Sequence, residues 1–480
     1  MVAAPDRGAA ALPKTGGIPL NETKQLEVFR SAAVPTAVLK TTVPAMIAML
    51  MVLIYNLADT FFIGMTRDPY QLAAVSMAMP VFLIFMSVGT VFGIGGTSVI
   101  SRALGEGRLE YAKKVCAFCM WSCVAVGLVL SALFLLGMEH ILKWMGTSAD
   151  THDLVKTYLT IVSLGGPFVL ISNCYSNVVR AEGQSQKAMM GQLMGNLLNV
   201  ILDPIMISLL GWGVAGAAVA TVAGNLFGAC YYILFFLKKR SILSIHPRDY
   251  SLRDGICTGV LSIGIPASLG SLMMSVSQVV MNGQMAAFGD MAVAGVGVAS
   301  KVIMITGLLC IGFGQGVQPL LGFCIGARLW DRFRKIMRFS IVFALCLSIL
   351  MTIVCYVFSG VLIRVFVTEP AALDYGVRFL RILLTTSFLF GLFYVFANAL
   401  QAAGAATPAL IVNLSRQGII YIPALFLLKN LLGANGLVWA QPVADILSIA
   451  LVVILYSRTV RRLTAEAEGT PGVRANEGKP

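Results

Sequence analysis

Charged residues are scarce in this sequence of 480 residues. Only 12% of the chain is Asp, Glu, Lys or Arg, whereas 58% is hydrophobic and the mean hydropathy is +0.85. A soluble domain carries roughly 25% charged residues, so about half of the usual solubilising surface is missing. This shortage excludes an ordinary soluble protein.

Several features that would indicate an enzyme or an ATP-driven pump are also absent. The sequence has no Gly-x4-Gly-Lys-Ser/Thr motif, so we do not expect ATP to power it. Its three histidines, His140, His152 and His246, fall in loops or at span ends, where they do not suit a buried proton relay. The ten cysteines lie scattered in apolar segments without acidic or histidine partners at metal-site spacing. We therefore predict neither an enzyme nor a metalloprotein.

Long apolar runs, in contrast, fill the chain from Val34 to Tyr456. About 20 apolar residues are enough for a helix to span a bilayer core. The sequence thus predicts an all-α integral membrane protein with 12 transmembrane helices. The expected spans are 41–64, 72–103, 114–137, 155–179, 188–210, 213–237, 258–288, 292–325, 334–359, 377–400, 409–431 and 436–457.

The positive charges predict the topology. The formal net charge is +13, and the basic residues cluster in short gaps between apolar segments, as in Lys238, Lys239 and Arg240. Cytoplasmic loops carry such an excess, so we expect both termini in the cytoplasm and no nucleic-acid partner. The predicted division is an N-terminal tail (1–33), an N-lobe (34–237), a basic cytoplasmic linker (238–256), a C-lobe (257–457) and a C-terminal tail (458–480).

The two halves of the chain repeat each other. Four short matches occur in the same order at offsets of 220 to 222 residues, and they pair Pro44 with Pro266, Gly105 with Gly326, Gly183 with Gly404, and Gly213 with Gly433. Each half has six predicted spans, so the halves are parallel repeats. We expect two six-helix lobes related by a pseudo-two-fold axis, with a substrate path between them.

Two carboxylates lie within predicted spans of the first half. Asp59 is near the outer end of the first span, and Asp203 lies in the fifth. Ionisable side chains inside a bilayer are costly and indicate a functional site. Asn199 shares a helical face with Asp203, and Asn177 and Thr221 can add oxygen ligands. The alternative is structural, because Asp59 can cap a broken helix and Asp203 precedes Pro204, a usual place for a kink.

The second half has no carboxylate at the matching positions. Its one clear candidate is Asp445, near the middle of the last span. Lys301, Arg381 and Arg416 interrupt apolar segments, where they either line a cavity or snorkel to the membrane surface. The 23 methionines suit an adaptable apolar cavity and equally suit lipid-facing positions.

Four segments together resemble the multidrug and toxic compound extrusion family. They are NLADTFFIG in the first span, RAEGQSQKAM before the fifth, NLLNVILDP in the fifth and GVAGAAVATV in the sixth, and the resemblance extends over nearly the whole chain. It implies a two-lobed antiporter that exports amphipathic organic cations in exchange for H⁺ or Na⁺. The spans that carry acidic residues in one branch offer only Gln278, Asn282 and Asn398, which places the chain nearer the bacterial DinF- and MepA-like branches.

The resemblance also implies the site residues and the setting. The ion-coupling residues would be Asp59, Asn177, Asn199, Asp203 and Thr221, and Na⁺ would be held by Asp59, Asn199, Asp203 and Thr221. The expected C-lobe part of the substrate cavity consists of Gln278, Met281, Asn282, Lys301 and Asn398.

We expect a monomer in the bacterial inner membrane, in contact with lipids and small cationic substrates, and with no cofactor beyond the coupling ion. A lipid or lipid-linked oligosaccharide flippase of the same superfamily and an ion channel are the alternative functions. A flippase cavity would need several cationic side chains, and a channel would usually show a filter loop or a charged ring.

Overall fold

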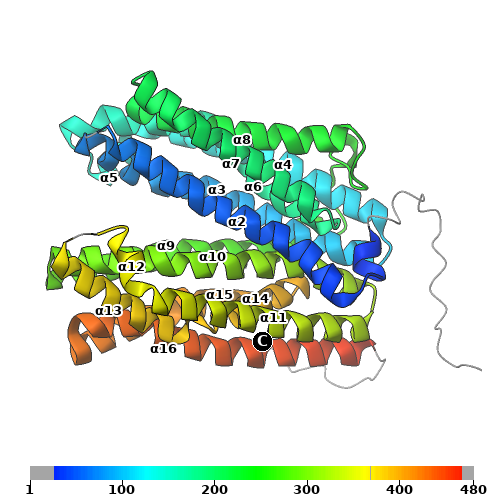
Figure 1. Cartoon of the computed structure of the whole chain (residues 1–480). Helices are drawn as coiled ribbons and strands as arrows, with labels where there is room; N and C mark the ends of the chain where they lie inside the picture. The colour runs from blue at the N-terminus through cyan, green and yellow to red at the C-terminus, as the bar shows by residue number, and fades with distance from the viewer. Residues whose placement is uncertain (1–25, 67, 368, 468–480) are drawn as a thin grey trace, which may run out of the picture.

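The computed structural model describes residues 26–66, 68–367 and 369–467, which are almost wholly helical and contain no strand. A bilayer offers no water to backbone polar groups, so an apolar chain satisfies them internally by forming helices. Figure 1 shows two bundles of helices, one from each half of the chain. The outer parts of both predicted tails, 1–25 and 468–480, lie outside the described residues.

The first bundle, here called the N-lobe, contains six long helices and one short one. Its helices are α2 (Val34–Gly64), α3 (Pro69–Gly105), α4 (Leu109–Leu136), α5 (Met138–Met145), α6 (Ala149–Ala181), α7 (Ser185–Asp203) with the π-helical turn η1 (Pro204–Leu209), and α8 (Gly213–Leu237). The helix α7 packs against α2, α6 and α8. Asp203, the last residue of α7, is therefore enclosed by other helices of its own lobe.

The second bundle, the C-lobe, repeats this plan with more breaks. Its elements are α9 (Ile256–Met285), η3 (Ala286–Phe288), α10 (Asp290–Gly326), α11 (Trp330–Val357), α12 (Ser359–Arg364), α13 (Pro370–Ser387), α14 (Phe390–Ala402), α15 (Ala406–Leu414), the π-helical turn η4 (Ser415–Ile419) and α16 (Tyr421–Ala467). Between the lobes, η2 (Pro247–Asp249) is one 3₁₀ turn of the linker.

The described residues account for twelve spans. Ten segments are long and apolar enough to cross a membrane, and α13 with α14 form an eleventh that is bent by 50°. One of the ten, Ala406–Ala467, contains a break at Gly433, whose φ is 63° and ψ −137°. This break divides it into two spans. The predicted count is confirmed, although α2 begins at Val34 rather than 41 and α16 continues through the first ten residues of the predicted C-terminal tail.

The repeat is visible in backbone details. Pro44 and Pro266 lie inside the first helix of each lobe and are both buried. Gly213 and Gly433 both have positive φ, 50° and 63°, at the break before the last span of their lobe. Glycine adopts this left-handed conformation without a steric penalty. The predicted relation between the two halves is therefore confirmed.

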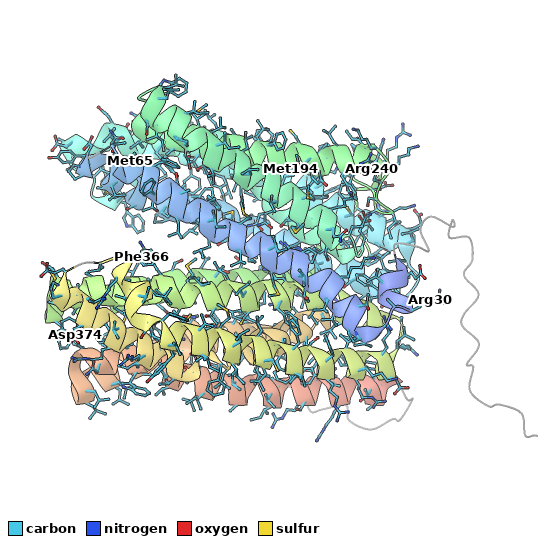
Figure 2. All side chains as sticks on the ribbon, in the orientation of Figure 1. Arg30, Met65, Met194, Arg240, Phe366 and Asp374 are labelled. Carbon is cyan, nitrogen blue, oxygen red and sulfur yellow. The ribbon has the colours of Figure 1, made fainter. Side chains whose placement is uncertain are left out.

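The lobes meet at the end of the molecule that carries the linker Lys238–Gly255, here called the basic end. Figure 2 labels Arg30 and Arg240 there, and Met65, Phe366 and Asp374 at the opposite end, where the bundles diverge. Contacts run between α2 and α10 and between α3 and α9. Gly105 and Gly326 face each other across the lobes, and a Cβ on either would overlap backbone atoms of the other lobe.

The linker packs against the N-lobe. The Glu182 carboxylate, between α6 and α7, is completely buried and accepts hydrogen bonds from Ser241 Oγ (2.6 Å) and the Ile242 amide (3.1 Å). Burial raises the pKa of Glu182 to about 8. Trp121 Nε1 donates to the carbonyl of Ile245, which fixes the middle of the linker.

Candidate functional site

A polar cavity of about 180 Å³ is lined by N-lobe residues together with Gln315 of the C-lobe helix α10, and is here called the N-lobe cavity. Its wall carries seven carboxamide side chains together with apolar and aromatic groups. The carboxamides belong to Asn173, Asn177, Gln192, Asn196, Asn199, Asn225 and Gln315. Ordinary ligand sites combine an apolar wall with a few polar groups, so the lining of this cavity is unusually polar.

Asp59 and Asp203 are both buried, at 7% and 0% exposure. Asp59 Oδ1 and both carboxylate oxygens of Asp203 have no hydrogen-bond partner among the described residues. The two carboxylates interact electrostatically with each other. No salt bridge within the described residues involves either of them. An unpartnered buried charge is among the most costly groups in a protein, so these oxygens need a proton or a cation.

The predicted neutral partners lie on neighbouring helices of the same lobe. Asn199 Nδ2 is 3.4 Å from Thr221 Oγ1, which joins α7 to α8, and Asn199 Oδ1 has no partner among the described residues. Asn177 on α6 donates to the carbonyl of Asn173 at 3.0 Å. Asn177, Asn199 and Thr221 all line the N-lobe cavity. The structure thus brings the five predicted ion-coupling residues into one lobe, and their role stays a prediction.

Two tyrosines that the sequence reading did not single out belong to the same region. Tyr55 lines the cavity one helical turn before Asp59, and it interacts electrostatically with Asp59 and Asp203. Tyr158 on α6 is 2% exposed and interacts with both carboxylates as well. The sequence signal that could have found Tyr55 is its four-residue spacing from Asp59, which places both residues on one face of α2.

The expected C-lobe residues are not brought together. Asn398 is buried and lines a C-lobe cavity. Gln278 donates to Asn282 Oδ1 at 3.2 Å on an exposed face, Lys301 is exposed, and Met281 is buried in the apolar core. None of these four lines either cavity, because Gln278 and Lys301 lie on exposed faces and Met281 packs into the apolar core.

A buried ion pair occupies the C-lobe instead. Arg416 Nε lies 2.8 Å from Asp445 Oδ1, and their side chains are 6% and 2% exposed. Within the described part of the chain the Arg416 side chain is buried, bonds to side chains and not to backbone, and lines the C-lobe cavity with its guanidinium over the rings of Phe390 and Phe393. Asp445 is thus a structural partner and not an independent acid.

Comparison with known proteins identifies the family. The model of the MatE family matches twice, over residues 44–205 and 266–427, in agreement with the repeat. The chain belongs to the MatE family. Both matches together cover most of the spans, and the resemblance to the multidrug and toxic compound extrusion family is confirmed.

Relatives of this MatE chain include bacterial exporters. It is 30% identical to the multidrug export protein MepA of Staphylococcus aureus, over 90% of this chain and 96% of that protein. It is 29% identical to the protein of the same name from Staphylococcus saprophyticus, over 93% and 98% of the two chains.

Solved structures share the fold. A multidrug resistance MATE family transporter in an outward-facing conformation superposes with a TM-score of 0.87, at 23% identity, over 93% of this chain and 99% of the other. A transporter of the MOP superfamily from Pyrococcus furiosus, described as having a binding pocket of reversed polarity, gives 0.85 at 23% identity, over 92% and 98%.

Proposed function

We propose that this MatE chain is a secondary active multidrug exporter, which moves amphipathic organic cations out of the cell in exchange for H⁺ or Na⁺. The observation that carries the proposal is the pair of buried carboxylates, Asp59 and Asp203, with unpartnered oxygens in the N-lobe. The name of the staphylococcal relatives, multidrug export protein, supports the substrate class.

Competition for these carboxylates provides the coupling. A coupling ion that neutralises Asp59 and Asp203 removes the attraction for a cationic substrate, whereas a substrate cation takes the place of the ion. An antiporter requires this mutual exclusion, since both cargoes must not cross together. A membrane potential supplies about 2.3 kcal/mol per charge per 100 mV. Each pH unit adds about 1.4 kcal/mol, so either gradient is sufficient.

The choice between H⁺ and Na⁺ rests on the surrounding ligands. Na⁺ would be bound by oxygens of Asp59, Asn199, Asp203 and Thr221. Asn199 Oδ1 is unpartnered and suits a cation, but Thr221 Oγ1 already accepts from Asn199 Nδ2. A proton needs only one carboxylate oxygen, so we favour H⁺.

The geometry also suits alternating access. With the basic end in the cytoplasm, as the distribution of Lys and Arg predicts, the lobes are joined on the cytoplasmic side and diverge on the outside. Arg180 Nη1 of the N-lobe donates to Gln315 Oε1 of the C-lobe at 2.8 Å between the joined halves. We infer an outward-open state of a monomeric protein in the bacterial inner membrane, surrounded by lipid.

The alternative functions have less support. A flippase for lipid-linked oligosaccharides needs unneutralised cations for its pyrophosphate, but Lys301 is exposed and Arg416 is paired with Asp445. A channel would usually have a ring of charged side chains, whereas Arg416 is the one charged residue among those that line the two described cavities, and it is paired with Asp445.

Purified protein in vesicles tests the proposal. Ethidium transport is measured under an imposed pH gradient and, separately, an imposed Na⁺ gradient. We expect the wild type to respond to one gradient. Asp59→Asn and Asp203→Asn should each bind ethidium through the remaining carboxylate but lose most gradient-driven transport. The matched control is Asp374→Asn, because this carboxylate is exposed at the diverging end and, among the described residues, forms an ion pair only with Arg378.

Two outcomes would contradict the proposal. Transport at the wild-type rate in both Asp→Asn variants would leave the carboxylates with a packing role only. Transport independent of both gradients would exclude antiport, whatever the variants do.

A further inference from the structure

The C-lobe contains its own cavity of about 130 Å³, on the opposite side of the interface from the two N-lobe carboxylates. Its wall includes Phe393, Tyr394 and five carboxamide side chains. These carboxamides belong to Gln315, Asn398, Gln401, Asn413 and Gln417. An apolar protein cavity of about 150 Å³ holds one benzene ring, so this cavity accepts a group of about that size.

Hydrogen bonds fix the orientation of two of these carboxamides. Asn398 Nδ2 donates to the carbonyl of Tyr394 at 2.8 Å, and Asn413 Nδ2 donates to the carbonyl of Pro266 at 3.1 Å. A carbonyl can only accept, so the amide nitrogens must face these groups and the oxygens Oδ1 must turn away from them. The Oδ1 atoms of Asn398 and Asn413 are therefore left to accept hydrogen bonds from a ligand.

Gln401 adds a third acceptor. Its side chain is 5% exposed and lines the cavity, and its Oε1 has no hydrogen-bond partner among the described residues. Buried polar atoms in folded proteins are nearly always hydrogen-bonded. The missing donor at Gln401 is what a ligand in the cavity would supply.

The charge of this cavity is balanced internally. Arg416 is its one charged lining residue, and Asp445 accepts hydrogen bonds from Arg416, from Gln441 (2.9 Å) and from Thr386 (3.1 Å). The pair is neutral as a whole and is fully bonded on the carboxylate side. The repeat offsets place Gly195 and Asn225 at the corresponding N-lobe positions, so the pair is specific to the C-lobe.

We propose that the C-lobe cavity is a second substrate subsite, which takes an aromatic ring bearing hydrogen-bond donors such as amino or hydroxyl groups. The inference rests on the proposed export function, in which the N-lobe carboxylates take the cationic part of the same molecule. Phe393 and Tyr394 provide an aromatic wall for the ring, and the three carboxamide oxygens accept from its donors.

The position of Gln315 connects the two subsites. This residue of α10 lines both cavities, so one ligand can contact the N-lobe and the C-lobe on either side of it. Its Oε1 is held by Arg180 of the N-lobe. A substrate that extends past Gln315 would therefore contact both lobes next to the bond that joins them.

Binding of two dyes with the same charge tests the subsite. Ethidium carries two aromatic amino groups, and 5-ethyl-6-phenylphenanthridinium is the same cation without them. We expect wild-type protein to bind ethidium about tenfold more tightly, as one or two hydrogen bonds would produce. Gln401→Met keeps the length of the side chain and removes the acceptor, and it should abolish this preference without changing affinity for the deaminated dye.

The matched control is Gln71→Met, because Gln71 Oε1 is also buried without a partner but the residue lines neither cavity. This variant should keep the tenfold preference. Equal affinity of the wild type for both dyes, or a preference that survives in Gln401→Met, would overturn the subsite. A clear preference in a wild type that exports ethidium under neither gradient would support the subsite and contradict the proposed function.

Discussion

Removing the charge of Asp445 should strongly destabilise the protein. In Asp445→Asn the guanidinium of Arg416 stays 5% exposed but loses the carboxylate at 2.8 Å that neutralises it. Breaking a buried ion pair by removing one partner costs about 3–5 kcal/mol, because an uncompensated charge is left behind. The Phe390 and Phe393 rings against the guanidinium offset only about 1 kcal/mol of this. We expect a net loss of about 3 kcal/mol in the free energy of unfolding.

Chemical denaturation of the detergent-solubilised protein measures this change. The control Asp374→Asn removes an exposed carboxylate from a pair with Arg378 and should cost less than about 1 kcal/mol. The double variant Arg416→Met with Asp445→Leu should recover most of the loss, since apolar residues of similar volume replace a buried pair well. A loss in Asp445→Asn no larger than in the control, or a double variant less stable than the single one, would refute the reasoning.

Two further changes address the basic end and the linker. Gly326→Val should force the lobes apart, because a Cβ at this position would overlap the backbone of Arg102. On a background without the exposed Cys230 and Cys346, a cysteine in place of the fully buried Ser98 should then react with a water-soluble maleimide. Gly283→Val, where a Cβ meets nothing within 4 Å, should leave that cysteine protected. Because burial raises the pKa of Glu182 from about 4.5 to about 8, the folded state retains a proton that the unfolded state releases, and stability should fall as pH rises from 5 to 8. Glu182→Gln should flatten this part of the melting-temperature profile, and an unchanged slope would contradict the assignment.

The N-lobe candidates could be predicted because their chemistry and position are both local signals. A carboxylate in an apolar run is costly wherever the helix faces, so Asp59 and Asp203 stand out in the sequence alone. Asn199 follows from the four-residue spacing on one helix. The sequence does not predict that oxygens of Asp59, Asn199 and Asp203 lack hydrogen-bond partners, because this depends on which groups surround them in three dimensions.

The C-lobe cavity residues could not be predicted in the same way. A membrane helix presents apolar side chains both to lipid and to its neighbours, so the sequence does not distinguish its inner face from its outer face. Gln278 and Lys301 were expected to line a cavity but lie on exposed faces. The Arg416–Asp445 pair does not follow from the sequence, because the two residues are 29 positions apart on η4 and α16 and meet only through tertiary packing.

The repeat explains why the two lobes can have different tasks on one fold. Each lobe has a cavity lined by many carboxamides. Asp59 and Asp203 of the N-lobe have no compensating cation in the described residues, whereas Asp445 of the C-lobe has Arg416 at 2.8 Å. Asp445 already accepts hydrogen bonds from Arg416, Gln441 and Thr386, so a coupling ion would stabilise it little. Asp203 has two unpartnered oxygens, so a coupling ion would stabilise it strongly. Ion coupling is therefore expected in the N-lobe, and the neutral C-lobe cavity is left to recognise the hydrogen-bond donors of the cargo. Because substitutions in the C-lobe cavity would then alter which dyes are exported, and not which gradient drives export, selectivity and energy coupling could change separately.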